Sequence, residues 1–158
     1  MLGQAEADRL QTMPKRIVQP GNPVFPEPGC GQTLELESLD RRQKFLMDIH
    51  RHGHIVRMKC TYQERHNVIN RLARLDIGGS PHQNPNVDTV PVPILESYNG
   101  ATVKCPHLHL YVEGYDDRWA VPAPPDTFPD TTALVPTMKD FMRYCGVERI
   151  PEIQLALQ

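Results

Sequence analysis

The sequence predicts an α+β fold, with an antiparallel sheet of four to five strands, one helix before it and one helix after it. Two segments, residues 55–62 and 104–113, alternate between apolar and polar side chains as half-buried strands do. Residues 138–145 instead repeat apolar side chains at helical spacing. A length of 158 residues fits one domain, which we place at residues 38–158, after an N-terminal segment with a proline-rich arm at residues 1–37.

The proline-rich arm occupies residues 18–31. Its four prolines exclude a regular helix and a central strand, so we expect the arm to follow an extended path. Such an arm lies either on its own domain or on a neighbouring subunit. In the second case it would join two chains in a homodimer.

The helix before the sheet is expected between Ser38 and Gly53. Ser38 suits the N-cap position, and Gly53 suits the end of the helix. The apolar face of this helix would consist of Leu39, Phe45, Leu46 and Ile49. Three histidines would follow at the helix end and in the next loop, whereas in an extended segment they would share one face and bind a metal. These histidines are His50, His52 and His54.

A basic hairpin is expected next, formed by residues 55–62 and 68–77. Glycine and proline then punctuate a tight loop at residues 78–85. Two prolines within residues 87–95 allow only an edge strand there, because proline has no N–H to donate to a neighbouring strand.

The central strand at residues 104–113 is followed by a short strand at residues 118–121. The last helix should begin near Pro136, since proline fits the first turn of a helix. It should end at Gly146, where a glycine is favoured after the last helical residue. The methionines and the phenylalanine of this helix are predicted to lie in the core.

Charge is unevenly distributed along a chain whose net charge is only −2. The stretch from residue 40 to residue 75 holds nine Lys and Arg but three acidic residues. It forms either a surface for phosphate or nucleic acid, or a solvated hairpin with ordinary charges. No apolar run approaches the roughly 20 residues that cross a bilayer, and we expect no membrane contact. The start of the chain does not resemble a secretory signal, and its four scattered cysteines are typical of reduced thiols, so we expect a cytoplasmic protein.

The central strand carries a row of groups that can transfer protons. Its aliphatic residues would enter the core, whereas His107, His109, Tyr111 and Glu113 would share the opposite face. In one interpretation the two histidines bind a metal together with His82 or Glu113. In a second they are the acid and the base of a metal-independent ribonuclease. In a third they form only structural hydrogen bonds to loop carbonyls.

The ribonuclease interpretation also requires cations for the phosphate and aromatic rings for the bases. Candidates for holding the phosphate are Arg65, Lys59 and Arg118. Candidates for stacking a base are Tyr111 and Trp119. The basic hairpin favours this interpretation over the structural one.

Several stretches resemble the DUF6978 family, a group of small bacterial proteins of unknown function. The matching segments are residues 59–65, 75–85, 107–120 and 141–145. The resemblance implies a single domain and supports one constellation made of His82, His107, His109, Tyr62, Arg65 and Trp119. It implies no established activity, and it links the chain to accessory proteins of mobile elements, which include toxin-like nucleases.

We therefore predict a small cytoplasmic ribonuclease of toxin type that acts on RNA or another nucleic acid and needs neither a metal nor a cofactor. The predicted catalytic residues are His82, His107, His109, Tyr62 and Arg65. The predicted substrate-binding residues are Lys59, Arg57, Tyr111, Arg118 and Trp119. The alternatives are a non-enzymatic module that binds nucleic acid or protein, and a metal-dependent enzyme that uses the His-x-His pair.

Overall fold

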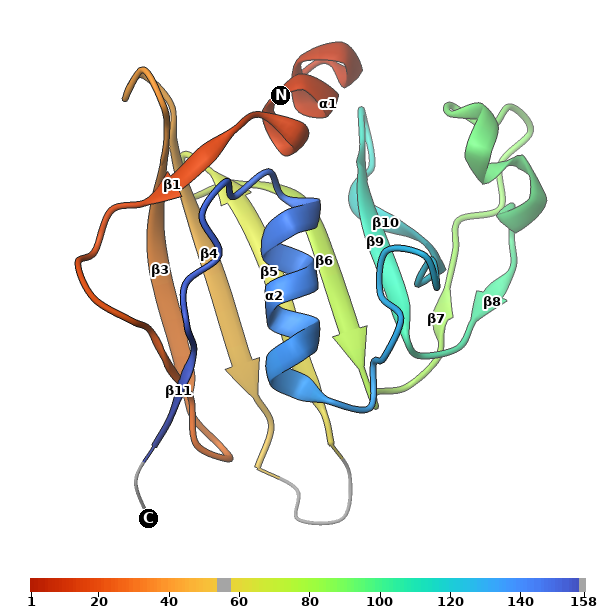
Figure 1. The fold of residues 1–158 in the computed structure, drawn as a ribbon. Coiled ribbons are helices and arrows are strands. Elements are labelled where there is room, and N and C mark those ends of the chain that lie inside the picture. Colours follow the sequence, from red (N-terminus) through yellow and green to blue (C-terminus); the bar gives the residue numbers. More distant parts are fainter. Residues whose placement is uncertain (54–57, 157–158) are drawn as a thin grey trace.

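The computed structural model describes residues 1–53 and 58–156, and its centre is a seven-stranded antiparallel sheet (Figure 1). Neighbouring strands follow the order β1–β3–β4–β5–β6–β9–β10. Their bounds are β1 (Lys15–Ile17), β3 (Gly31–Ser38), β4 (Lys44–Arg51), β5 (Cys60–His66), β6 (Asn70–Ile77), β9 (His107–Val112) and β10 (Asp116–Pro122). The predicted α+β class with an antiparallel sheet is confirmed, but four to five strands were too few.

Helix α2 (Leu134–Tyr144) runs across one face of the sheet, which we call the helix face (Figure 1). Helix α1 (Gln4–Thr12) packs at one end of β6 and β9, and Gln11 donates from its side-chain amide to the carbonyl of Tyr144 over 2.9 Å. Among the described residues, no helix has the length and apolar character needed to span a bilayer.

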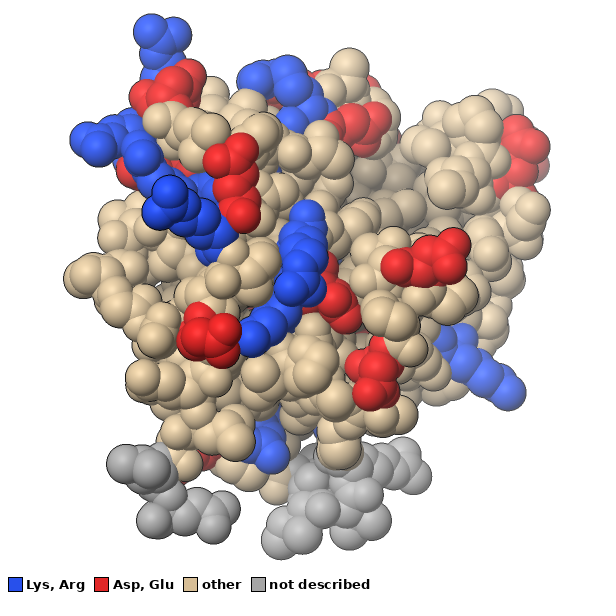
Figure 2. Space-filling model, viewed as in Figure 1, with Lys and Arg blue, Asp and Glu red and all other residues tan. Residues whose placement is uncertain are grey.

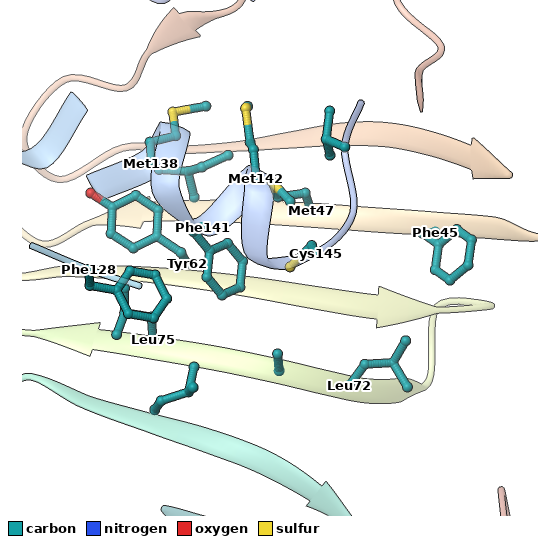
Figure 3. Packing of buried hydrophobic residues seen from close by; sticks show 14 of the residues in the cluster. Phe45, Met47, Tyr62, Leu72, Leu75, Phe128, Met138, Phe141, Met142 and Cys145 are labelled. Carbon is teal, nitrogen blue, oxygen red and sulfur yellow. The ribbon is translucent and has the colours of Figure 1, made fainter. Parts of the chain in front are cut away.

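The core lies between α2 and the sheet. Figure 3 shows the side chains of Met138, Phe141 and Met142 directed toward the strands. The ring centroids of Tyr62 and Phe141 are 6.0 Å apart, and the Tyr62 hydroxyl donates to the carbonyl of Leu134 over 2.7 Å. The apolar spacing that predicted this helix is therefore the spacing of its buried face.

The end of α2 is fixed by Gly146, as predicted. Its φ of 84° lies in the left-handed region, and a Cβ at this position would be 2.4 Å from the carbonyl oxygen of Met13. Only glycine fits this backbone conformation and this close approach of the two backbone segments, at Gly146 and Met13.

The helix expected between Ser38 and Gly53 is wrong, because this segment forms the β3–β4 hairpin. Phe45, Met47 and Ile49 are buried on the helix face, with more exposed residues between them, so the period is two. Leu46 also lies between them, and its apolar side chain creates the misleading helical spacing. Ser38 ends β3, and its hydroxyl accepts a hydrogen bond from the backbone N–H of Gln43 in the turn. The helix that precedes the sheet is α1.

The β5–β6 hairpin forms as predicted, but β5 overlaps the predicted first strand only at residues 60–62 and continues to His66, so the turn lies later than expected. Residues 54–57, and with them the start of the predicted strand, His54 and Arg57, lie outside the described residues. Ile69 lies within the predicted second strand at residues 68–77, but it is 80% exposed, because the turn at Asn67 and Val68 extends to this residue.

Between β6 and β9 the chain leaves the sheet and returns. This excursion contains β7 (His82–Gln83), a 3₁₀ helix η1 (Pro93–Tyr98) and β8 (Thr102–Val103), and β7 pairs with β8. The edge strand expected at residues 87–95 is absent from the described structure, and η1 occupies part of that segment. Gly78, with a φ of 69°, starts the excursion, and a Cβ there would be 2.4 Å from the carbonyl oxygen of Met58.

The proline-rich arm lies against the end of its own chain. Within it, β2 (Val24–Phe25) pairs in parallel with β11 (Gln154–Leu155). Strands β1 and β3, which come before and after the arm's prolines, belong to the same sheet as the later strands. A homodimer formed through the arm stays a prediction.

Candidate functional site

The face of the sheet opposite the helix face, which we call the polar face, carries two rows of side chains across neighbouring strands. Strand pairing aligns one row from Asp48, Gln63, Arg74 and His109. It aligns the other from His50, Thr61, Asp76 and His107. Directly opposite side chains on one face are close neighbours, so β6 and β9 bring an Arg-x-Asp pair against the His-x-His pair.

Asp76, His107 and His109 form a compact group, which we call the histidine centre. Oδ2 of Asp76 lies 3.3 Å from Nε2 of His107 and 3.2 Å from Nε2 of His109. The two imidazole rings meet edge to face, with centroids 4.9 Å apart. The histidines are 2% and 1% exposed, whereas the Asp76 side chain is 20% exposed. One ligand atom from each residue thus lies within 4.8 Å of the other two, as in sites that bind metal.

The second nitrogen of each ring faces a backbone carbonyl. Nδ1 of His107 lies 3.2 Å from the carbonyl oxygen of Val103, and Nδ1 of His109 lies 2.9 Å from that of Asp117. An N–H donated from Nδ1 leaves Nε2 with a lone pair. Backbone carbonyls that orient histidines in this way are typical of metal sites.

This arrangement sets two lone pairs against a carboxylate. A neutral imidazole has a single N–H, so a ring that donates from Nδ1 presents its Nε2 lone pair to Asp76. Two imidazolium rings would supply the missing N–H groups, but they would place two like charges side by side in a buried site, next to Arg74. A divalent cation bound by both nitrogens and the oxygen takes the place of both protons and satisfies all three atoms.

Asp76 is held in its ionised form. Its Oδ2 lies 3.2 Å from Nε of Arg74, and a guanidinium charge at this distance favours the ionised carboxylate. The Thr61 hydroxyl donates to Oδ1 of Asp76 over 2.9 Å, whereas Oδ2 faces the two histidines and also accepts from Nε of Arg74. The carboxylate is therefore an anionic ligand at neutral pH.

Arg74 lies beside the histidine centre and leaves the lone pairs free. Its Nη1 donates to Asp117 over 2.8 Å, and its Nε donates to Asp76 over 3.2 Å. Nη2 is 2.9 Å from Nε2 of His109 and 3.4 Å from Nδ1 of the same ring. A donor in line with one lone pair would be much farther from the other nitrogen, so Nη2 lies over the ring face.

His82 joins the centre from the excursion. Its ring centroid is 4.5 Å from that of His109 and 6.0 Å from that of His107, and its Nε2 donates to the carbonyl of Arg118 over 2.8 Å. Burial lowers the pKa of His82, although the bond to Arg118 opposes this shift. The neutral His82 ring is therefore a third imidazole, next to those of His107 and His109.

Asn84 fixes the same segment to β10. Its side-chain amide donates to the carbonyl of Ala120 and accepts from the N–H of Ala120, both over 2.8 Å. The amide therefore pairs with one residue of the edge strand as another peptide group would. This pairing holds His82 over the histidine centre.

Two predicted substrate-binding residues lie at the border of the site. A Cβ on Gly79 would be 3.5 Å from Cε of Lys59 and 3.6 Å from Sγ of Cys105, so the Lys59 side chain reaches the excursion. Sγ of Cys105 lies 3.5 Å and 4.0 Å from the two ring nitrogens of His107. Arg118 contributes its carbonyl, and its residue is exposed.

The other predicted site residues lie elsewhere. Tyr62 and Trp119 are fully buried on the helix face, because their strand positions alternate away from the histidines. The hydroxyl of Tyr111 donates to the carbonyl of Leu2 over 2.7 Å, so this ring anchors the N-terminal segment. Arg65 is on the polar face, where it pairs with Asp48 over 2.6 Å. The predicted constellation is therefore reduced to its three histidines.

Glu113, the other candidate third ligand, also lies away from the histidine centre. It accepts a hydrogen bond from the backbone N–H of Gln4 over 2.9 Å, at the start of α1. Asp76 takes its place, and it was missed together with Arg74. Arg74 and Asp76 stand at alternate positions of β6 and therefore share its polar face, but the pairing of β6 with β9 spans the excursion and leaves no local signal.

Acidic residues pair with part of the basic stretch. Arg71 and Arg74 both pair with Asp117, at 3.4 and 2.8 Å. Lys44 pairs with Glu37 at 2.7 Å. Figure 2, which views the helix face, shows Lys and Arg gathered near β1 and the β3–β4 turn with Asp and Glu among them. These charges favour the solvated hairpin over a nucleic-acid surface.

The comparisons with known proteins identify the family and give no activity. We found no curated protein and no solved structure that matches the chain. The model of a family of unknown function, DUF6978, matches residues 2–147, and the chain belongs to this family, as the resemblance of its segments had predicted.

Proposed function

We propose that the protein binds one divalent transition-metal ion, such as Zn²⁺, through Asp76, His107 and His109, and uses it for hydrolysis. The observation that supports this is the pair of Nε2 atoms that face one carboxylate oxygen at 3.3 and 3.2 Å while their Nδ1 atoms face backbone carbonyls. Two neutral nitrogens and one carboxylate are a common ligand set for catalytic zinc.

Three protein ligands leave an exchangeable position on the metal. The ion would supply a water nucleophile near neutral pH, which is the basis of metal-assisted hydrolysis. The side chains of Asp76 and Arg74 are 20% and 26% exposed, so a substrate would approach past them. The buried rings of His107 and His109 would bind the ion on the side away from solvent.

Equilibrium dialysis against Zn²⁺, followed by metal analysis, tests this proposal. We expect one tightly bound ion per chain, and we expect His107→Ala or His109→Ala to abolish it. His50→Ala is the matched control, because it removes an exposed histidine from the same polar face without touching the histidine centre. Equal binding by the His109→Ala and His50→Ala proteins would refute the proposal.

A second candidate is the metal-independent ribonuclease. Its support is the third imidazole, His82, against His109, together with the Arg74 guanidinium beside the same ring. These groups provide the acid, the base and the cation that phosphodiester cleavage requires. Incubation of mixed-sequence RNA with and without a chelator separates the two candidates. Cleavage that persists with the chelator and is lost in His109→Ala would favour the ribonuclease, and cleavage that the chelator abolishes would favour the metal.

A further inference from the structure

We infer that the metal-loaded histidine centre binds a small oxyanion, a phosphate or carboxylate group, at the exchangeable position, with Arg74 and Lys59 as its protein contacts. This inference rests on the proposed metal site and names the substrate class that such a site would accept. It follows from the balance of charges around the centre, from unused donors on Arg74 and from the position of Lys59.

Four charged side chains next to the centre balance one another before a metal is added. Asp76 and Asp117 are matched by Arg71 and Arg74, with contacts between 2.8 and 3.4 Å. Two neutral imidazole ligands add no charge, so a divalent ion leaves the site with two positive charges. An uncompensated charge in a partly buried site is costly, and an anionic ligand on the metal removes that cost.

Arg74 retains donors for such a ligand. Its contacts with Asp76, Asp117 and His109 engage Nε, Nη1 and Nη2 once each. A guanidinium has five N–H groups, so Nη1 and Nη2 each keep a second one. Its planar arrangement of donors matches the geometry of carboxylate and phosphate oxygens.

Lys59 adds a second cation at the border of the site. A Cβ placed on Gly79 would lie 3.5 Å from Cε of Lys59 and 3.6 Å from Sγ of Cys105, so both side chains are near this glycine. The same sulfur lies 3.5 Å from Nδ1 of His107. The described residues provide no carboxylate within ion-pair distance of Lys59. A neutral or cationic substrate would leave this charge uncompensated.

The test uses protein loaded with Co²⁺, whose visible absorption reports on the ligands of the ion. Inorganic phosphate and acetate are titrated in separate experiments at constant ionic strength, with chloride as the reference salt. We expect a saturable spectral change with phosphate or acetate and none with chloride. Metal analysis after desalting checks that the cobalt stays on the protein.

Variants assign the contacts. Lys59→Gln should weaken oxyanion binding by about fivefold, as expected for one partly exposed charge, and leave Co²⁺ binding unchanged. Lys139→Gln is the matched control, since Lys139 lies on α2 and pairs with Glu152. Equal oxyanion affinity in the two variants would overturn the role of Lys59.

The outcomes for the metal and for the oxyanion are distinguishable. A cobalt spectrum that neither phosphate nor acetate changes would overturn the oxyanion inference and leave the metal site standing. The absence of any cobalt spectrum in the intact protein would overturn both. A saturable response to either oxyanion supports both.

Discussion

The sheet buries ionisable side chains on both faces, and the two groups differ in how their charges are compensated. On the helix face, Lys15 and Glu64 are fully buried and form an ion pair of 2.9 Å. The Lys15 ammonium also lies 4.4 Å from the ring centroid of Phe45. It donates over 2.7 to 3.0 Å to the carbonyls of Leu10, Gln11, Met13 and Cys145. These bonds tie the ends of α1 and α2 to β5, and the charge is balanced within the protein.

The histidine centre on the polar face is partly open to solvent, unlike the Lys15–Glu64 pair. Its two Nε2 atoms share one oxygen of Asp76, and the carboxylate and its neighbour Arg74 are reached by solvent. A buried charge that is fully paired stabilises the fold only as long as both partners stay in place. A buried group with an unused lone pair can instead bind something from outside. We therefore assign a structural role to the first cluster and a binding role to the second.

The largest effect is expected from Lys15→Met. The variant keeps the length of the side chain but leaves Glu64 and four carbonyls without their partner, which should cost about 3–5 kcal/mol of unfolding free energy. Urea denaturation measures the loss. Lys139→Met, which removes a partly exposed ion pair between α2 and Glu152, should stay within about 0.5 kcal/mol. A similar small change in Lys15→Met would mean that the helix-face cluster is not structural.

The pH dependence of stability tests the same cluster through Glu64. Burial raises the pKa of Glu64 from its ordinary 4.5 to about 7, although the charge of Lys15 opposes the shift. Between these values the folded protein keeps a proton that the unfolded chain has lost, so unfolding becomes easier as the pH rises. This carboxyl group should therefore contribute a loss of about 3 kcal/mol from pH 4.5 to pH 7. Denaturation curves of Glu64→Gln should lack that part of the slope, and parallel pH profiles would contradict the assignment.

Metal should stabilise the protein through the polar face alone. At a free Zn²⁺ concentration about 100 times Kd, binding to the folded state adds about 2.7 kcal/mol of unfolding free energy. Thermal unfolding with and without Zn²⁺ should show this gain in the intact protein and in His50→Ala. The gain should vanish in His109→Ala. If it survives there, the ion binds elsewhere.

Asn84→Ala should cost about 2 kcal/mol, because it leaves the buried N–H and carbonyl of Ala120 without partners. It should also loosen His82, which the same segment carries. Denaturant titration measures the loss, and Thr89→Ala, at an exposed position of the excursion, is the control. Equal stability of the two variants would mean that water replaces the amide.

The smallest effect is expected from Arg65→Ala. Arg65 and Asp48 form a partly exposed ion pair with two contacts, of 2.6 and 2.9 Å, which should contribute about 1 kcal/mol or less. Zn²⁺ binding should be unchanged, because the pair lies outside the histidine centre. Loss of the metal in this variant would extend the site to β5 and restore the catalytic role first predicted for Arg65.

Local pattern was sufficient for part of the fold and the site. The alternation of residues 104–113 predicted that His107 and His109 face away from the core, and the spacing of α2 predicted its buried side. The β3–β4 hairpin was mistaken for a helix because Leu46, on the polar face, completes a helical apolar pattern with Phe45 and Ile49. Two periods compete in such short segments, and only packing decides between them.

The third ligand required knowledge of strand pairing. Asp76 and His107 are opposite each other in the sheet, but the excursion separates them along the chain. Tyr62 was placed with the histidines because of sequence resemblance, and Trp119 also as a ring for stacking a base. Neither argument carries information about the face of a strand. The site could not be predicted in full without the strand order, in which β6 lies beside β9.

Asn84 also blocks part of the edge of the sheet at which another molecule could pair with β10. Strand β10 is the last strand of the sheet, and the peptide groups of such a strand attract strands from other molecules. The Asn84 amide occupies both peptide groups of Ala120, and His82 occupies the carbonyl of Arg118. The same short segment that completes the site therefore limits growth of the sheet into aggregates, so that solubility and site assembly depend on the same two side chains.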